Sequence, residues 1–123
     1  MRYVILIYSN PESRRLWDAF PAERRREGLE AYAALNEALT ASGELIAAEA
    51  LAGPDTGRRV HVEAGRTTST DGPFAEVKEV VAGFYLVECD GADRALEIAA
   101  RVPEAAMGLV EVRPVTALSG FEA

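Results

Sequence analysis

A short turn near the middle of the chain is the place where residue types and spacing most favour chemistry. Asp71 is followed by Gly72 and Pro73, so its carboxylate can accept hydrogen bonds from the next backbone amides, while Gly72 takes a positive φ and Pro73 fixes the chain direction. Such a turn holds Phe74 in a defined direction, and we assign Phe74 to ligand binding. Two interpretations of Asp71 stay open: a catalytic base or substrate anchor, and a turn residue satisfied by its own backbone.

A second group of polar residues belongs to the last predicted strand. Glu111 and Arg113 are two residues apart and therefore lie on the same face of a strand. A guanidinium among apolar neighbours needs a partner. The pair therefore indicates either a polar pocket for a small anion or carboxylate, or an ion pair in a dimer interface. The hydroxyls of Tyr8, at the end of the first predicted strand, and of Tyr85 are placed to reach such a pocket. Half-buried packing with the hydroxyl in water is the plainer interpretation of both tyrosines.

The remaining reactive side chains give weaker patterns. His61, the single histidine, is a candidate ligand-binding residue, although it stands in an arginine-rich segment where a solvated histidine is the plainer interpretation. Cys89 is the single cysteine, which excludes an internal disulfide. One histidine with scattered carboxylates falls short of the three or four convergent ligands that a metal needs. We therefore predict neither a metal nor a cofactor.

Composition limits the classes of partner. The chain has 123 residues, 49% hydrophobic and 27% charged, which predicts one globular domain over residues 1–115 and a loose tail over 116–123. The net charge of −7 argues against nucleic-acid binding, which needs a basic face. No apolar run reaches the ~20 residues of a membrane span, and the short hydrophobic start indicates a strand rather than a signal peptide. We expect a cytoplasmic protein without a membrane partner.

Hydrophobic periodicity places these residues on elements. Apolar residues on both faces predict a central strand over 2–8, followed by a connection with one helical turn over 14–17. A stripe of Leu29, Tyr32, Leu35 and Leu39, ended by Gly43, predicts a helix over 21–42. Further strands are predicted over 44–51, 58–63, 66–70, 82–89 and 108–115, with a second helix over 92–101.

This order of elements predicts a ferredoxin-like α+β fold: an antiparallel sheet with two helices on one face and an inserted β-hairpin. The other sheet face is left uncovered. In the last strand Val110 and Val112 belong to the helix side, so Leu109, Glu111 and Arg113 belong to the uncovered side. A face that mixes apolar and charged groups is typical of a surface that packs against another subunit around a polar pocket. We therefore predict a homodimer.

The segment from Thr70 to Glu79, TDGPFAEVKE, resembles the signature of the DGPF family within the YCII-related superfamily. The opening YVILIY, the GFYL strand and the closing VEVRPV follow in the order of that family. The resemblance implies a ferredoxin-like protomer that dimerises as an α+β barrel, and it implies no reaction. Better-known YCII-like relatives hold a histidine and an aspartate in the cleft. Asp71 matches that aspartate, but His61 lies on the inserted hairpin, so a His–Asp dyad is not expected here.

Three functions fit the sequence. The favoured one is a homodimeric small-molecule-binding or enzyme-like protein that uses Asp71, Glu111 and Arg113, with Tyr8 and His61, on a small polar metabolite. The second is a non-catalytic regulatory module: genes of the resembled family often lie beside those of extracytoplasmic-function sigma factors, which implies a sigma-factor-related protein partner. The third is a dimeric scaffold whose role depends on its context.

Overall fold

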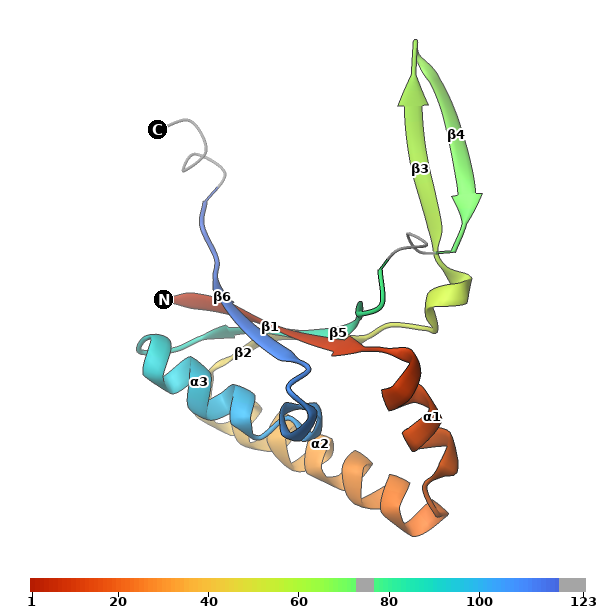
Figure 1. Ribbon diagram of the computed structural model, residues 1–123. Helices are drawn as coiled ribbons and strands as arrows, with labels where there is room; N and C mark the ends of the chain where they lie inside the picture. Colours follow the sequence, from red (N-terminus) through yellow and green to blue (C-terminus); the bar gives the residue numbers. More distant parts are fainter. Residues whose placement is uncertain (73–76, 118–123) are drawn as a thin grey trace.

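The main sheet has four strands, and the computed structural model describes it within residues 1–72 and 77–117. The strands are β1 (Arg2–Ser9), β2 (Leu45–Ala50), β5 (Val80–Glu88) and β6 (Val110–Pro114). Their order is β2-β5-β1-β6, and every neighbouring pair is antiparallel. This arrangement is consistent with the predicted ferredoxin-like α+β fold (Figure 1).

Two helices cover one face of this sheet. They are α2 (Ala22–Ser42) and α3 (Ala92–Ala100), which run beneath the sheet in Figure 1. Alternate residues of β1 and β5 point towards the helices, and their side chains are removed from water, as a period of two requires. The buried core includes Tyr3, Ile5, Ile7, Val87, Leu35, Leu39, Ala95 and Ile98. None of the helices in the described residues lies on the opposite face of the sheet (Figure 1).

The connection after β1 is a complete helix, so the prediction of a single turn over residues 14–17 was wrong. Helix α1 covers Pro11–Ala19. Asn10 caps it: the Asn10 side chain accepts from the Ser13 amide at 2.7 Å, and the Ser13 hydroxyl accepts from the Asn10 amide at 3.0 Å. Pro11 suits the first helical position because the missing amide hydrogen has no partner there. The Trp17 ring lies against Gly28 of α2.

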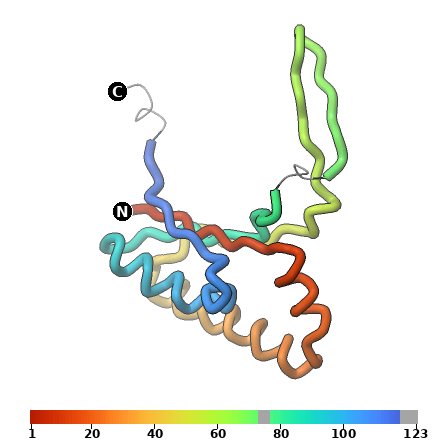
Figure 2. Tube along the Cα trace, in the orientation of Figure 1, coloured from red at the N-terminus to blue at the C-terminus, as the bar shows by residue number. Residues whose placement is uncertain are grey.

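The predicted hairpin forms a sheet of its own. Strands β3 (Arg58–Glu63) and β4 (Arg66–Asp71) pair only with each other. In Figures 1 and 2 the hairpin rises from the side of the main sheet that the helices leave uncovered. Its base is closed by the Gly72 amide, which donates to the Gly57 carbonyl at 2.7 Å. Gly72 has a φ of +79°, which confirms the positive φ predicted for this turn.

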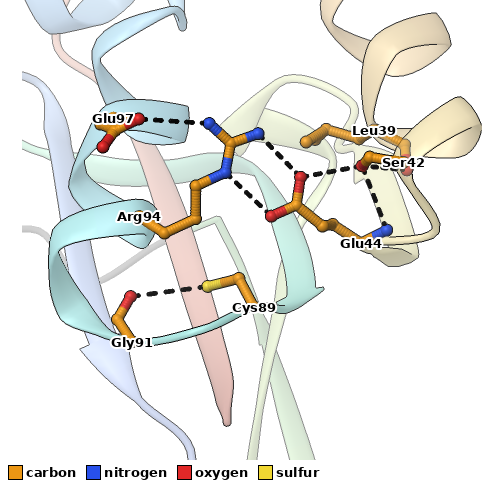
Figure 3. A network of polar contacts seen from close by, with 7 residues as sticks. All are labelled: Leu39, Ser42, Glu44, Cys89, Gly91, Arg94 and Glu97. Atoms are coloured by element: carbon orange, nitrogen blue, oxygen red, sulfur yellow. Dashed lines mark hydrogen bonds and ion pairs between the residues drawn. The ribbon is translucent and has the colours of Figure 1, made fainter.

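A network of charges fastens α3 to the start of β2 (Figure 3). Arg94 donates through Nε and a terminal nitrogen to the two carboxylate oxygens of Glu44, at 2.9 and 2.7 Å, and it also reaches Glu97 at 3.3 Å. The Ser42 hydroxyl donates to Glu44 as well, at 2.8 Å. The Arg94 and Ser42 hydrogen bonds lower the pKa of Glu44 from 4.5 to about 2. This ion pair holds two elements together and lies apart from the polar residues that the sequence singles out.

Candidate functional site

The uncovered face of the main sheet is apolar at its centre. Along β1, Val4, Leu6 and Tyr8 alternate with the buried residues and are half-buried. Leu6 lies between Phe84 of β5 and Glu111 of β6 in the strand register. Val4 is flanked in the same way by Leu86 and Arg113. We call this surface the open face: Val4, Leu6, Phe84 and Leu86, with polar groups along β6 and at the end of β1.

Three residues predicted for the site are joined on the open face. The Tyr8 hydroxyl donates to Glu111 Oε1 at 2.7 Å, and Arg113 Nε donates to Glu111 Oε2 at 3.0 Å. Tyr8 comes from the end of β1, whereas Glu111 and Arg113 come from the adjacent edge strand β6. The structure therefore places Arg113 in an ion pair within its own strand. We call these three residues the open-face cluster.

Electrostatics set the protonation states of the cluster. The hydrogen bond from Tyr8, and then that from Arg113, lower the pKa of Glu111. The same hydrogen bond to Glu111, together with burial, raises the pKa of Tyr8. At neutral pH Glu111 is consequently a carboxylate and Tyr8 a neutral phenol. The cluster is thus suited to holding a ligand by hydrogen bonds, because a phenol with a raised pKa is a poor general base.

Arg113 is the group of the cluster that could hold an anion. Its side chain is 62% exposed and uses Nε for Glu111. A guanidinium carries four further N–H donors in a planar fork, which matches the geometry of a carboxylate or similar oxyanion. An anion arriving at the open face would therefore find donors that Glu111 has already oriented.

Of two hollows near this end of the sheet, the smaller is lined by residues of the cluster and the larger is not. The smaller one, of about 360 Å³, is lined by Tyr8, Glu79, Gly108, Leu109, Val110 and Glu111. The larger one, of about 790 Å³, lies at the start of α1, with the lining Asn10, Pro11, Glu12, Arg15, Val77, Lys78 and Glu79. Both volumes fall in the range of small-molecule sites. Glu79 lines both hollows, so the end of the TDGPFAEVKE segment lies next to the cluster. Glu79 was not predicted as a site residue from the sequence, and its position in that segment is the signal that could have found it.

Asp71 and His61 lie elsewhere in the protomer. Asp71 ends β4 and is 87% exposed, with Oδ1 3.6 Å from Arg58 Nε. His61 is 71% exposed on β3, with Nε2 3.6 Å from Glu63 Oε2. Both stand on the projecting hairpin, so the protomer does not bring them to the open-face cluster. Phe74 is outside the described residues, and its assignment to ligand binding stays a prediction.

Tyr85 belongs to the helix side of the sheet and not to the site. It is buried, its hydroxyl donates to Asn36 Oδ1, and its ring stacks on that of Tyr32 with 6.5 Å between centroids. The Tyr32 hydroxyl donates in turn to Glu104. Burial raises the pKa of both phenols. The sequence of β5 already indicates that Tyr85 faces the helices, because it is two residues from the buried Val87 and therefore lies on the same face of the strand.

The described residues contain neither a set of metal ligands nor a membrane-spanning helix. Within residues 1–72 and 77–117, no three histidine, cysteine or acidic side chains converge as a metal site would require. In the same residues, no helix has both the length and the apolar character needed to cross a bilayer. Cys89 is buried, with its thiol 3.6 Å from the Gly91 carbonyl oxygen.

Comparison with known proteins assigns the chain to a family. The model of the YCII-related domain matches residues 1–119. The chain is also 32% identical over 117 residues to an uncharacterised protein of Rhizobium meliloti (strain 1021), covering 94% of this chain and 92% of that protein. The chain belongs to the YCII-related family. The superfamily predicted from the TDGPFAEVKE segment is thereby confirmed.

A solved structure supports the fold of this YCII-related chain. It is 5-chloro-2-hydroxyhydroquinone dehydrochlorinase from Burkholderia phenoliruptrix AC1100, in complex with 2,5-dihydroxybenzoquinone. The likeness covers 98% of each chain with a TM-score of 0.51 and 16% identity. At that identity the likeness establishes a shared architecture only.

Proposed function

We propose that this YCII-related protein is a homodimeric small-molecule-binding or enzyme-like protein whose ligand binds at the open-face cluster. The observation that carries the proposal is the hydrogen-bonded set of Tyr8, Glu111 and Arg113 beside a hollow on an uncovered sheet face. An exposed ion pair on an ordinary surface contributes little to stability. Here a phenol and a guanidinium converge on one carboxylate next to apolar side chains, which is the composition of a binding site.

The cluster favours a small, flat ligand that carries an oxyanion or hydroxyl groups. The guanidinium of Arg113 can bind an oxyanion with two parallel hydrogen bonds, and the Glu111 carboxylate can accept from a ligand hydroxyl. Leu6 and Phe84 offer an apolar surface on which a ring can lie. The dehydrochlorinase of similar fold holds 2,5-dihydroxybenzoquinone, a ligand of this kind, which makes oxygenated aromatic rings and small carboxylates the first compounds to test.

A second copy of the chain would complete the site. The centre of the open face is apolar, and a sheet face of this kind is normally covered. Two open faces packed against each other give the α+β barrel implied by the family resemblance, and they would exclude water from the cluster. Exclusion of water strengthens the charged hydrogen bonds of Arg113 with a ligand. Asp71 and His61 would join such a site only from the hairpin of the second copy.

Thermal denaturation in the presence of ligands tests the proposal. The purified protein is screened against benzoate, 2,5-dihydroxybenzoquinone and a broad set of small polar metabolites. A ligand at one hundred times its dissociation constant stabilises the folded state by about 2.7 kcal/mol, which raises the melting temperature by several degrees. Arg113→Ala should abolish that rise. Arg26→Ala is the matched control, because Arg26 is a similarly exposed, ion-paired arginine on α2.

An undiminished ligand response in Arg113→Ala would remove the cluster from the binding site. No response to any compound would favour the regulatory module instead. The next experiment would then be a search for a sigma-factor-related protein partner.

A further inference from the structure

We infer that the β3–β4 hairpin is an arm that docks, through the face bearing Val60 and Val62, on the second copy of the chain. The inference rests on the homodimer proposed above and adds a contact that the sheet-to-sheet packing does not include.

The two faces of the hairpin differ in character. Val60 pairs with Ser69 and Val62 pairs with Thr67, and paired residues point to the same side of an antiparallel ribbon. We call this side the valine face. Val60 is 67% exposed and Val62 is 60% exposed, so the protomer leaves both uncovered. At the base of the hairpin the valine face also carries Arg58 opposite Asp71, joined as an ion pair. The opposite face has no valine and carries polar residues, among them His61, Glu63, Thr68 and Thr70.

Among the residues that the structure describes, the hairpin gains little support from the body of its own protomer. Its strands pair only with each other, and their residues are exposed with the exception of the half-buried Arg59. A two-stranded hairpin is marginally stable in water unless it packs on something else. β-Branched side chains at exposed positions on both sides of His61 indicate a surface made for such packing.

The direction of the hairpin points to a second copy as the occupant. It rises from the same side of the main sheet as the open face (Figure 1). If two open faces meet across a two-fold axis, each hairpin must pass alongside the body of the other protomer. Each hairpin strand has six residues and spans about 20 Å, which is enough to run along the width of a four-stranded sheet whose strands are ~4.8 Å apart.

Charge favours the same occupant. The hairpin carries Arg58, Arg59 and Arg66 against Glu63 and Asp71, an excess of positive charge in a chain whose net charge is −7. The remainder of the chain is therefore more acidic than the whole. The arm as a whole, with three arginines against two carboxylates, complements a second copy of this more acidic body. On the valine face itself Arg58 and Asp71 form an ion pair, so that face brings no net charge to the contact.

The test compares matched substitutions on the two faces of the hairpin. Val60→Glu with Val62→Glu places two charges on the valine face, and Thr68→Glu with Thr70→Glu places two on the other face. The dimer dissociation constant of each full-length variant is measured by sedimentation velocity. The valine-face variant should weaken the dimer by at least about tenfold, and the control variant should leave it close to that of the wild type.

Hydrogen exchange of the wild-type protein tests the same contact without any substitution. Amides of residues 58–71 should be protected at concentrations where the protein is a dimer, and they should exchange quickly on dilution below the dissociation constant. Fast exchange of this segment in the dimer would overturn the inference.

The two proposals can fail separately. A wild type that is monomeric at all concentrations would remove the homodimer and the arm together. A dimeric wild type whose dissociation constant is unchanged by the valine-face charges, or is changed equally by both pairs, would remove the arm and leave the homodimer standing.

Discussion

Tyr8 and Glu111 are 103 residues apart in the chain, and one hydrogen bond joins them on the open face. That bond orients the carboxylate from one side while Arg113 holds it from the other. At the proposed site a ligand would therefore meet a guanidinium whose direction is already set, which would lower the entropy lost on binding. In the proposed function the phenol of Tyr8 is a positioning group.

Tyr8→Phe tests this role by removing the hydroxyl alone. The carboxylate of Glu111 loses its largest stabilising hydrogen bond, so the pKa of Glu111 should rise towards its ordinary value. In the wild type, the stability that ionised Glu111 contributes is complete above the ordinary pKa of a glutamate and is lost as the pH falls through the lowered pKa of Glu111. In the variant that pKa is higher, so the same stability should be lost at a higher pH. NMR titration of the side-chain carboxyl signals measures the shift. An unchanged Glu111 titration would contradict the bond, and Glu44 serves as the internal reference.

Part of this site could be predicted from residue spacing. Glu111 and Arg113 share a face because strand side chains alternate with a period of two, and no other knowledge is needed. The hydrogen bond between Tyr8 and Glu111 depends on β1 and β6 being neighbours in the sheet. The alternation of residues within one strand does not give that order. Of the two interpretations of Tyr85, packing is the one that holds: its phase with Val87 places the ring in the core, and its hydroxyl does not reach the site.

At the scale of elements, the contact between β2 and α3 depends on Glu44 and Arg94 (Figure 3). The two residues lie 50 positions apart, so no local pattern predicts them. Helix α1, by contrast, had a readable start. Asn10 followed by Pro11 is a strong N-terminal pattern for a helix, but the polar residues that follow carry no clear apolar stripe, and the segment was expected to be a connection.

Glu44→Gln should destabilise the fold by about 1 to 2 kcal/mol at neutral pH, because charged hydrogen bonds of a mostly buried carboxylate are replaced by neutral ones. The pKa of Glu44 is lowered from 4.5 to about 2 in the folded state. Its contribution is therefore complete above pH 4.5 and declines as the pH falls towards 2. Urea denaturation of both proteins from pH 7 downwards should show the two stabilities converging in that interval.

Glu97→Gln is the control for this element. Glu97 meets the same arginine but is 67% exposed, so its replacement should change stability very little. If both variants lost the same free energy of unfolding, the ion pair between Glu44 and Arg94 would contribute no more to stability than the exposed pair with Glu97.

At the scale of the whole molecule, the proposed homodimer gives the open face a cover. Leu86→Glu places a charge in the apolar centre of that face, and the proposed dimer should dissociate at least about tenfold more readily. Leu96→Glu is the matched control, because Leu96 is 56% exposed on α3 on the helix side. Light scattering coupled to size exclusion gives the masses. A Leu86→Glu dimer as tight as that of Leu96→Glu would show that the open face is not the interface.

The arrangement of the main sheet could be predicted from the order of its elements, because antiparallel sheets with right-handed crossovers admit few alternatives. The position of the hairpin could not. Alternating Val60 and Val62 predict a strand, but the same alternation fits an edge of the main sheet as well as a separate ribbon. The separation follows from the turn at Gly57 and Gly72, whose hydrogen bond joins the two ends of the insertion.

The packing of Trp17 against Gly28 has an optical consequence. Trp17 is the single tryptophan of the chain, and its ring lies at the junction of α1 and α2 with Phe20 at 6.3 Å. Intrinsic tryptophan emission therefore reports the seating of α1 on α2 and not the state of the sheet. During unfolding, a fluorescence transition that precedes the loss of the far-ultraviolet dichroism would show this junction opening before the core.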